Sequence, residues 1–286
     1  MVTGGTSGIG FAIAERFLQE GASSIILVGR SQQRLQTAAD RLHASAGARS
    51  IQSDSQGALE TVRLLVGDVG NAGSWIREIE KEMAMVDVLV NAAGISISNI
   101  LPRSELEDIS QILRTNLEGA IITSRALIRA AIRCRVRSRN KESVGTKLPS
   151  KCIINVSSLL ALRAGTGAVP YAASKAGILG LTRSVAVESA SSLKDLAIRS
   201  NAIVPGYIET PMIAGKHLSY SWMTPAGTDK NISTDFTPRE MNRLKDMIPL
   251  HRFGDPREVA DAAVFLAQNE YANNCVLNID GGLSAV

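Results

Sequence analysis

A tyrosine and a lysine four residues apart, Tyr171 and Lys175, are the first residues in this sequence whose types and spacing could do chemistry. Residues four apart lie on the same face of an α-helix, and Pro170 suits entry into a helix. An ammonium held beside a phenol favours the phenolate and lowers the pKa of the tyrosine. Tyr171 could then donate a proton to a carbonyl oxygen or remove one from an alcohol. Unaccompanied, this spacing is common by chance and typical of ordinary helices.

Three further polar residues follow or lie near predicted strands. Ser158 comes shortly after the apolar run Ile153–Val156, thirteen positions before Tyr171, and its hydroxyl could bind the same carbonyl oxygen. Asn91 closes another apolar run, and Asn116 lies in the long helical pattern that follows. Open α/β sheets bind ligands beyond the carboxyl ends of their strands. We therefore expect these residues to meet at that edge.

The glycine-rich segment Thr3–Gly10 (TGGTSGIG) runs directly into an apolar helical pattern. Glycines permit a tight turn and a close approach of the backbone to a pyrophosphate, and a helix N-terminus presents free N–H groups to phosphates. A glycine-rich turn is a weak signal by itself. Its place before a helix, in a chain of alternating strands and helices, strengthens the prediction of a dinucleotide site.

Arg30 follows the second predicted strand, where a dinucleotide fold meets the adenosine ribose. An acidic residue there favours NAD, whereas an arginine accommodates the 2′-phosphate of NADP. The sequence therefore predicts NADP(H), although a solvated arginine without a ligand is the plain alternative.

Short apolar runs alternate with amphipathic stretches along the chain, which predicts an α/β fold: a single-domain, doubly wound (Rossmann) parallel sheet with helices on both faces. The predicted strands are Ser24–Gly29, Val62–Val66, Val86–Asn91, Lys151–Val156, Ala197–Val204 and Cys275–Ile279. The predicted helices are Gly8–Glu20, Ser31–Leu42, Ser74–Met83, Glu107–Arg133, Tyr171–Ser189 and Pro256–Gln268. Met1 and Val2 leave little room for a strand before the glycine-rich turn, so we expect a truncated first strand, or a true start further upstream.

Three stretches are predicted to be surface loops: His43–Glu60, Cys134–Ser150 and Ala214–Pro238. The last is long for a compact domain, and such loops are often functional, so we interpret it as a substrate loop. The second follows Arg133 and contains Arg135, Arg137, Arg139 and Lys141, a basic cluster that is more often a solvated face than a nucleic-acid site.

Composition argues against several classes of function. The formal net charge is +4 and aromatic residues make up 4% of the chain, so we expect no nucleic-acid partner. No apolar run is long enough for a bilayer, so we expect no membrane insertion. Three dispersed cysteines predict neither disulfides nor a zinc site, and we expect no metal.

Taken in order, these motifs resemble the short-chain dehydrogenase/reductase family over nearly the whole chain. The matching segments are Thr3–Gly10, Asp68-Val69, Asn91–Gly94 (NAAG), Asn116, Ser158, Tyr171–Lys175 and Pro205-Gly206. The resemblance implies an NADP-dependent oxidoreductase of 1–286 as one domain, acting on CH–OH groups, and a homotetramer.

The resemblance also implies a role for each matching residue. Tyr171 would be the general acid/base, Lys175 would lower its pKa and bind the nicotinamide ribose, Ser158 would orient the carbonyl, and Asn116 would hold a water in a proton relay. Asp68 and Val69 would contact adenine. The cofactor-binding set implied is Gly4, Thr6, Ser7, Gly8, Ile9, Gly10, Arg30, Asp68, Val69, Asn91, Ala92, Gly94, Tyr171, Lys175, Pro205, Gly206, Ile208 and Thr210.

Within the family the sequence is most similar to 3-oxoacyl-[acyl-carrier-protein] reductases, through the segments Pro205–Thr210, Ile248–Gly254 and Ile279–Gly282. This implies reduction of a 3-oxoacyl thioester on coenzyme A or acyl carrier protein in fatty acid biosynthesis. The long predicted substrate loop favours a ketone reductase of secondary metabolism or xenobiotics instead, and a non-catalytic NADP-binding regulator is a third possibility. The expected location is the cytoplasm, with the mitochondrial matrix as the alternative.

Overall fold

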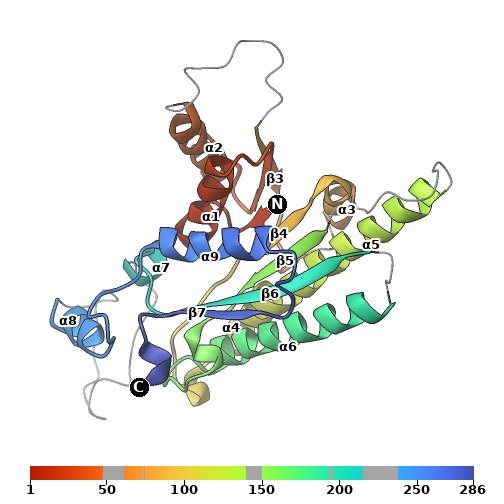
Figure 1. The fold of residues 1–286 in the computed structure, drawn as a ribbon. Coiled ribbons are helices and arrows are strands. Elements are labelled where there is room, and N and C mark those ends of the chain that lie inside the picture. Colours follow the sequence, from red (N-terminus) through yellow and green to blue (C-terminus); the bar gives the residue numbers. More distant parts are fainter. Residues whose placement is uncertain (48–60, 72, 74, 140–149, 193–195, 215–237) are drawn as a thin grey trace.

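The protein is a three-layer α/β structure around one seven-stranded parallel sheet, as the computed structural model shows (Figure 1). The strand order is β3-β2-β1-β4-β5-β6-β7, and every neighbouring pair is parallel. The structure describes residues 1–47, 61–71, 73, 75–139, 150–192, 196–214 and 238–286. The chain reverses direction across the sheet between β1 and β4, and this confirms the predicted doubly wound architecture.

The six predicted strands are all present with slightly different bounds. The apolar runs of the inner strands are buried because helices cover both faces of the sheet, whereas the edge strands β3 and β7 are partly exposed. The strands are β1 Val2–Thr3, β2 Ile25–Gly29, β3 Val62–Val66, β4 Val88–Asn91, β5 Lys151–Val156, β6 Ile198–Pro205 and β7 Val276–Ile279.

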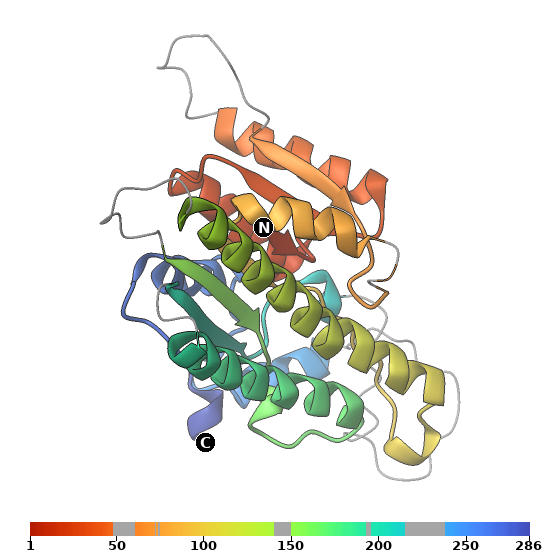
Figure 2. The same cartoon turned by 90° about the vertical axis from the view of Figure 1, so that its right-hand side faces the viewer.

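Helices form the two outer layers. One face is covered by α1 Gly8–Gln19, α2 Gln32–Gly47 and α9 Pro256–Gln268, and the other by α3 Ile76–Glu82, α5 Gly119–Arg139 and α6 Val169–Ser192 (Figure 2). The Asp255 carboxylate caps α9 by accepting a hydrogen bond from the Arg257 N–H, and the Glu258 carboxylate accepts one from the Asp255 N–H. The described residues also form three further α-helices, which are α4 Leu106–Leu113, α7 Pro211–Ala214 and α8 Pro238–Asp246.

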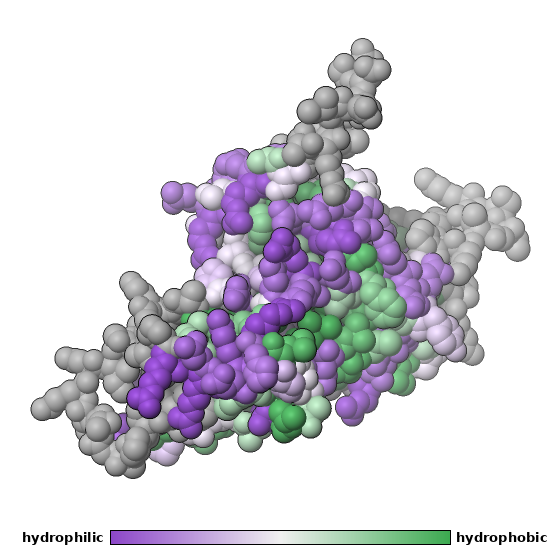
Figure 3. Space-filling view, turned by 60° about the vertical axis from the view of Figure 1, so that its left-hand side comes forward, coloured by the Kyte–Doolittle hydropathy of each residue, from purple (hydrophilic) through white to green (hydrophobic). Residues whose placement is uncertain are grey.

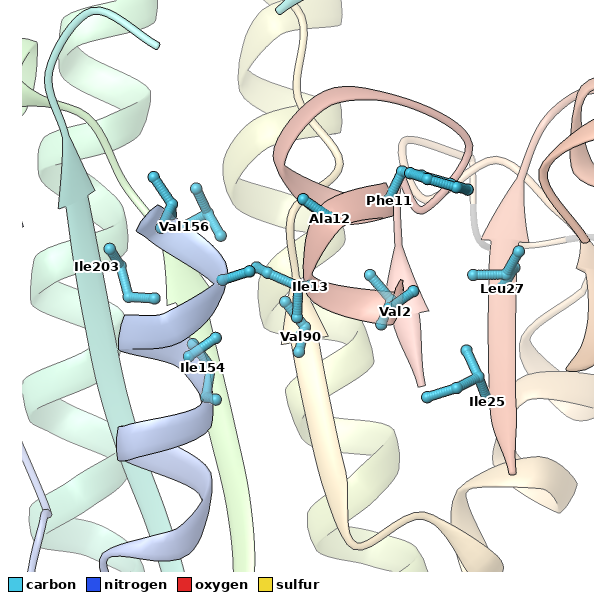
Figure 4. Close-up of a cluster of buried hydrophobic side chains, with 14 of the residues drawn as sticks. Val2, Phe11, Ala12, Ile13, Ile25, Leu27, Val90, Ile154, Val156 and Ile203 are labelled. Atoms are coloured by element: carbon cyan, nitrogen blue, oxygen red, sulfur yellow. The ribbon is translucent and has the colours of Figure 1, made fainter. Parts of the chain in front are cut away.

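The first strand is short, as predicted, yet it occupies the centre of the sheet. Val2 pairs with Leu27 of β2 and Val90 of β4, and it is fully buried. Its side chain lies between those of the flanking strands in the core cluster under α1 (Figure 4). Two residues therefore suffice to join the halves of the sheet, because the neighbouring strands supply most of the packing.

Two of the three predicted loops begin as helix. The stretch expected to be a loop from His43 continues α2 as far as Gly47, because alanines sustain the helix there. The stretch expected from Cys134 continues α5 to Arg139, since the alternating arginines are good helix formers and no glycine or proline interrupts them. Most of the remainder of these two loops lies outside the described residues, and so does most of the predicted substrate loop. The helices α7 and α8 flank the predicted substrate loop.

The long predicted helix Glu107–Arg133 is interrupted by a π-helical turn. Residues Arg114–Glu118 form this turn between α4 and α5. A π turn holds one residue more than an α turn and often marks a functional position. Here it contains Asn116, which is buried.

Several large apolar side chains remain exposed on the described surface, among them Phe265, Tyr271 and Val276 near the β7 edge. Figure 3 shows hydrophobic residues gathered in a broad area of one face, bordered by hydrophilic ones. Such areas mark contact surfaces. None of the described helices combines the length and the hydropathy needed to cross a bilayer.

Candidate active site

A cavity of about 640 Å³ opens at the carboxyl ends of the strands. This is where doubly wound folds bind their ligands. Almost all of the predicted site residues line it. These are Gly4, Thr6, Ser7, Gly8, Ile9, Gly10, Arg30, Asp68, Val69, Ala92, Gly94, Ser158, Tyr171, Lys175, Pro205, Gly206, Ile208 and Thr210. Asn91 and Asn116 are not among the lining residues.

The glycine-rich turn is packed too closely to admit side chains. Gly4 has a φ of +68°, and a Cβ there would lie 2.8 Å from the Cα of Ala93. A Cβ on Gly10 would lie 2.5 Å from the carbonyl oxygen of Gly4. Glycine is therefore required at these two positions of the turn, which lines the cavity at the start of α1, where a helix N-terminus suits a pyrophosphate group.

Thr3 ties this turn to the end of β4, a link that our sequence reasoning did not find. Its hydroxyl oxygen accepts hydrogen bonds from the backbone N–H groups of Ala92 and Ala93, each at 3.2 Å. The side chain is buried. The glycine-rich turn and the segment Asn91–Gly94, which the resemblance assigns to cofactor binding, are thus fixed to each other.

Two arginines, Arg30 and Arg34, lie at one end of the cavity together with Asp68. We call this end, defined by these three residues, the adenosine end. Both guanidinium side chains are exposed. Arg34 also reaches the glycine-rich turn, where its Nη2 donates to Ser7 Oγ at 3.4 Å. Sequence reasoning missed Arg34; its position four residues after Arg30, at the start of α2, was the available signal.

Asp68 and Val69 form a fixed turn beside this end. The Asp68 carboxylate accepts from the Gly70 N–H at 2.9 Å, and its backbone carbonyl accepts from the indole of Trp75 at 2.8 Å. Val69 is buried against Gly119, where a Cβ would lie 2.9 Å from it. These contacts position both residues at the cavity wall.

Ser158, Tyr171 and Lys175 meet at the other end, which we call the carbonyl end. Ser158 follows β5 and caps a 3₁₀ turn, where its hydroxyl accepts from the Leu160 N–H at 3.3 Å. Lys175 is 4% exposed, and its ammonium donates to the Val156 carbonyl at 2.8 Å and lies 5.7 Å from the centre of the Tyr171 ring. One turn of α6 thus holds the phenol and the ammonium side by side, as the spacing predicted.

The ionisation of this pair differs from the expectation. Burial raises the pKa of Tyr171, and a hydrogen bond with Ser158 opposes that rise in part. Burial also lowers the pKa of Lys175 to about 8. We expected Lys175 to lower the pKa of Tyr171, but removal of both groups from water dominates here. The phenol is therefore held in its protonated form, ready to donate a proton.

Asn116 supports the carbonyl end from behind. Its side-chain oxygen accepts from the Ile95 N–H at 2.8 Å, and its Nδ2 donates to the Ile95 carbonyl at 2.9 Å and to Ser174 Oγ at 3.1 Å. Ser174 precedes Lys175 on α6. The amide thus joins the segment after β4 to α6, and this is a positioning arrangement rather than one that faces the cavity.

Asn91 lies inside the protein in a buried polar network. Its Nδ2 donates to Asn155 Oδ1 at 2.9 Å, and its Oδ1 accepts from Thr123 Oγ1 at 2.7 Å. Asn155 in turn donates to Thr182 Oγ1 at 3.0 Å. All of these side-chain groups point into the core and bind β4 and β5 to α5 and α6. The cofactor-binding role implied for Asn91 stays a prediction.

The segment Pro205–Thr210 closes the cavity from the β6 side. It is held from two directions: the Gly206 N–H donates to the Ile279 carbonyl at 2.9 Å, and Ile208 forms an isolated parallel bridge with Gly254. The rings of Tyr207 and Phe253 pack with centroids 5.7 Å apart. The three sequence segments that suggested a 3-oxoacyl reductase therefore come together in space.

Comparisons with known proteins agree with this geometry. The family model described as short chain dehydrogenase matches residues 1–220. The chain belongs to the short-chain dehydrogenase family. Members of this family are oxidoreductases that use nicotinamide cofactors, and this chain is an oxidoreductase acting on CH–OH groups.

Individual relatives match over almost the full chain. A 3-oxoacyl-[acyl-carrier-protein] reductase of Bos taurus is 34% identical over 99% of this chain and 96% of its own. A 3-oxoacyl-[acyl-carrier-protein] reductase of Chlamydia muridarum is 32% identical over the same shares of both chains. Among solved structures, a variant of the actinorhodin polyketide ketoreductase with NADPH has a TM-score of 0.77 and 27% identity, covering 100% of this chain and 96% of that one.

Proposed function

We propose that this protein reduces a ketone to a secondary alcohol with NADPH, and that its substrate is a 3-oxoacyl thioester. The observation that carries the proposal is that a single cavity joins a closely packed glycine-rich turn and two arginines to Tyr171, the buried Lys175 and Ser158. The first set suits a phosphorylated dinucleotide, and the second suits proton transfer to a carbonyl oxygen.

The residues at the adenosine end fit NADP(H). The glycine-rich turn would hold the pyrophosphate, Asp68 and Val69 would border the adenine, and Arg30 with Arg34 would bind the 2′-phosphate. Lys175, Ile208 and Thr210 would border the nicotinamide riboside. When bound, this cofactor supplies the hydride for the reduction.

The carbonyl end would supply the proton and the orientation. Ser158 would donate a hydrogen bond to the substrate oxygen, and Tyr171 would give its proton to that oxygen as the carbonyl carbon is reduced. The phenol of Tyr171 is protonated at neutral pH, so it carries the proton that this step needs. The Lys175 ammonium would stabilise the phenolate left behind.

The substrate assignment is supported by the relatives named above and by the meeting of Pro205–Thr210, Ile248–Gly254 and Ile279–Gly282 beside the cavity. A substrate panel with NADPH tests it. We expect NADPH consumption with acetoacetyl thioesters at a higher kcat/KM than with free ketones such as cyclohexanone. Activity confined to unrelated ketones would overturn the acyl assignment.

A ketone reductase of secondary metabolism is the second candidate, and the likeness to a polyketide ketoreductase favours it. The same panel separates the two candidates, because cyclic or polycyclic ketones would then be the better substrates. A non-catalytic NADP-binding regulator is less well supported, since Ser158, Tyr171 and Lys175 are all present and assembled.

We further propose that the protein is a homotetramer and that acyl carrier protein delivers its substrate. The proposed location is the cytoplasm, with the mitochondrial matrix as the alternative. The exposed apolar area in Figure 3 supports association with other chains. The basic cluster at the end of α5 supports an acidic carrier only in part, because Arg133 lies 3.4 Å from Glu80 and is already paired. Size-exclusion chromatography with light scattering tests the oligomeric state.

A further inference from the structure

A second hollow lies beside the carbonyl end of the cavity. It encloses about 390 Å³ and is lined by Ile100, Leu101, Ala164, Gly165, Thr166, Gly167 and Val169. Three of these residues, Ala164, Gly165 and Thr166, also line the main cavity. The two spaces therefore share a wall formed by the segment between Ser158 and Tyr171, and we call the second one the side groove.

The lining of the side groove is apolar and small. None of the described residues that line it carries a charge, and Thr166 is the one among them with a polar side chain. Leu101 is 50% exposed and Val169 is 44% exposed, so large apolar surfaces face solvent at its rim. Leaving such side chains in water is unfavourable, and an apolar ligand laid over them would gain free energy by covering them.

The two walls of the groove are joined to each other. The Asn99 N–H donates to the Gly167 carbonyl at 3.0 Å, linking the segment before α4 to the segment before α6. Asn99 also donates through its Nδ2 to the Arg103 carbonyl at 2.6 Å, which closes the turn that carries Leu101. Gly167 has a φ of +77°, a conformation that glycine adopts readily. The groove is thus built into the described fold before any ligand arrives.

We propose that the side groove binds the apolar acyl chain of a substrate whose ketone lies at Ser158 and Tyr171. This inference rests on the proposed function, because it takes the carbonyl end as the place of reduction. The shared wall places the groove next to that end, and its uncharged lining disfavours a phosphate or carboxylate as the occupant. The enzyme is therefore selective for longer chains over short ones.

Chain length is the variable that tests this. The kcat/KM and KM are measured with NADPH and the N-acetylcysteamine thioesters of 3-oxobutanoate, 3-oxohexanoate and 3-oxooctanoate. Each methylene that enters the groove lowers KM by about two- to fourfold, the upper value being what ~0.8 kcal/mol per buried CH₂ corresponds to. A KM that does not change with chain length overturns the inference.

Two matched variants locate the effect. Leu101→Asp places a charge in the groove, and it is expected to raise KM for the octanoyl substrate at least tenfold while changing KM for the butanoyl substrate by less than threefold. Leu106→Asp makes the same substitution at the first residue of α4, which is 84% exposed and does not line the groove, and it should leave the chain-length dependence intact. If both variants lose chain-length dependence equally, the groove is not the site.

Binding provides a second readout that does not depend on turnover. Quenching of protein fluorescence by octanoyl-N-acetylcysteamine, which lacks the ketone, should saturate with the parent protein and weaken at least fivefold in Leu101→Asp. Failure of the proposed function looks different: the parent protein would then reduce none of the three thioesters. If the protein reduces all three thioesters with one common KM, the proposed function stands and only the role of the side groove in binding the acyl chain is contradicted.

Discussion

The two ends of the cavity handle charge in opposite ways. At the adenosine end, Arg30 and Arg34 are exposed, and they can meet a phosphate while water still surrounds them. At the carbonyl end, Lys175 is 4% exposed and the pKa values of both Tyr171 and Lys175 are shifted by burial. Exposed charges suffice to hold an anion, whereas proton transfer needs groups whose protonation the protein itself controls. The following predictions test whether the two ends are as separate as this comparison implies.

The largest effect is expected at the carbonyl end. Tyr171→Phe removes the proton donor and should lower kcat for reduction by about 10²- to 10⁴-fold. The dissociation constant for NADPH, measured by fluorescence titration, should change by no more than about threefold, since its charged contacts lie elsewhere. Tyr271→Phe is the matched control, because Tyr271 is 99% exposed and does not line the cavity. Unchanged turnover in Tyr171→Phe would contradict its catalytic role.

At the adenosine end, Arg30→Asp should weaken NADPH binding by about 10- to 100-fold, the loss of a charge-assisted hydrogen bond plus repulsion. Binding of NADH should weaken much less, because it lacks the 2′-phosphate. Arg77→Asp changes an exposed arginine of α3 outside the cavity and serves as the control. Equal losses for both cofactors would refute the assignment of Arg30 to the 2′-phosphate.

The pH dependence of reduction should report Lys175. Its ammonium is protonated below a pKa of about 8 and loses its charge above it. The kcat/KM for reduction should therefore be level from about pH 6 to 7.5 and fall up to about tenfold per pH unit above 8. A profile that stays level to pH 9.5 would show that the charge on Lys175 does not assist the phenol.

The smallest effect concerns stability. Because burial lowers the pKa of Lys175 from 10.5 to about 8, the unfolded chain binds a proton more readily than the folded one. This costs up to about 3 kcal/mol below pH 8, and the cost fades as the pH rises towards 10.5. Lys175→Met removes this cost, but it also leaves the Val156 carbonyl without its donor.

The net gain in free energy of unfolding for Lys175→Met should be about 1 kcal/mol at pH 7, and it should shrink between pH 8 and 10. Urea denaturation at several pH values measures it. Lys81→Met, at an exposed position of α3, is the control and should show no such trend. A gain that is constant with pH would mean that Lys175 is not desolvated in the folded protein.

The sequence predicted the architecture and the cavity well, because both depend on local patterns. Apolar runs identify strands covered on both faces, and the spacing of Tyr171 and Lys175 places them on one helical face. Contacts between distant segments were not predictable in this way. The hydrogen bonds of Thr3 to Ala92 and Ala93, and the burial of Asn91 among Thr123 and Asn155, depend on which strands are neighbours.

The direction of the Tyr171 pKa was wrong for a related reason. The sequence shows that an ammonium lies near the phenol, but it does not show how much water the fold removes from the two groups. Here desolvation of the phenol raises the pKa of Tyr171, and the hydrogen bond with Ser158 opposes this only in part. The C-terminal ends of α2 and α5 were predicted too early, because stretches of serine, alanine and arginine are compatible with either loop or helix.

The π-helical turn at Arg114–Glu118 makes the site sensitive to the length of the chain as well as to its composition. Its extra residue rotates everything before it by about 100° relative to an uninterrupted α-helix. Deleting one residue there would restore regular winding, and α4 and α5 would become one continuous helix. Asn116 would then turn away from Ile95 although no side chain in the cavity had been altered. A single-codon deletion distant in sequence from the glycine turn and from Tyr171 would thus disable the enzyme while making its helices more regular.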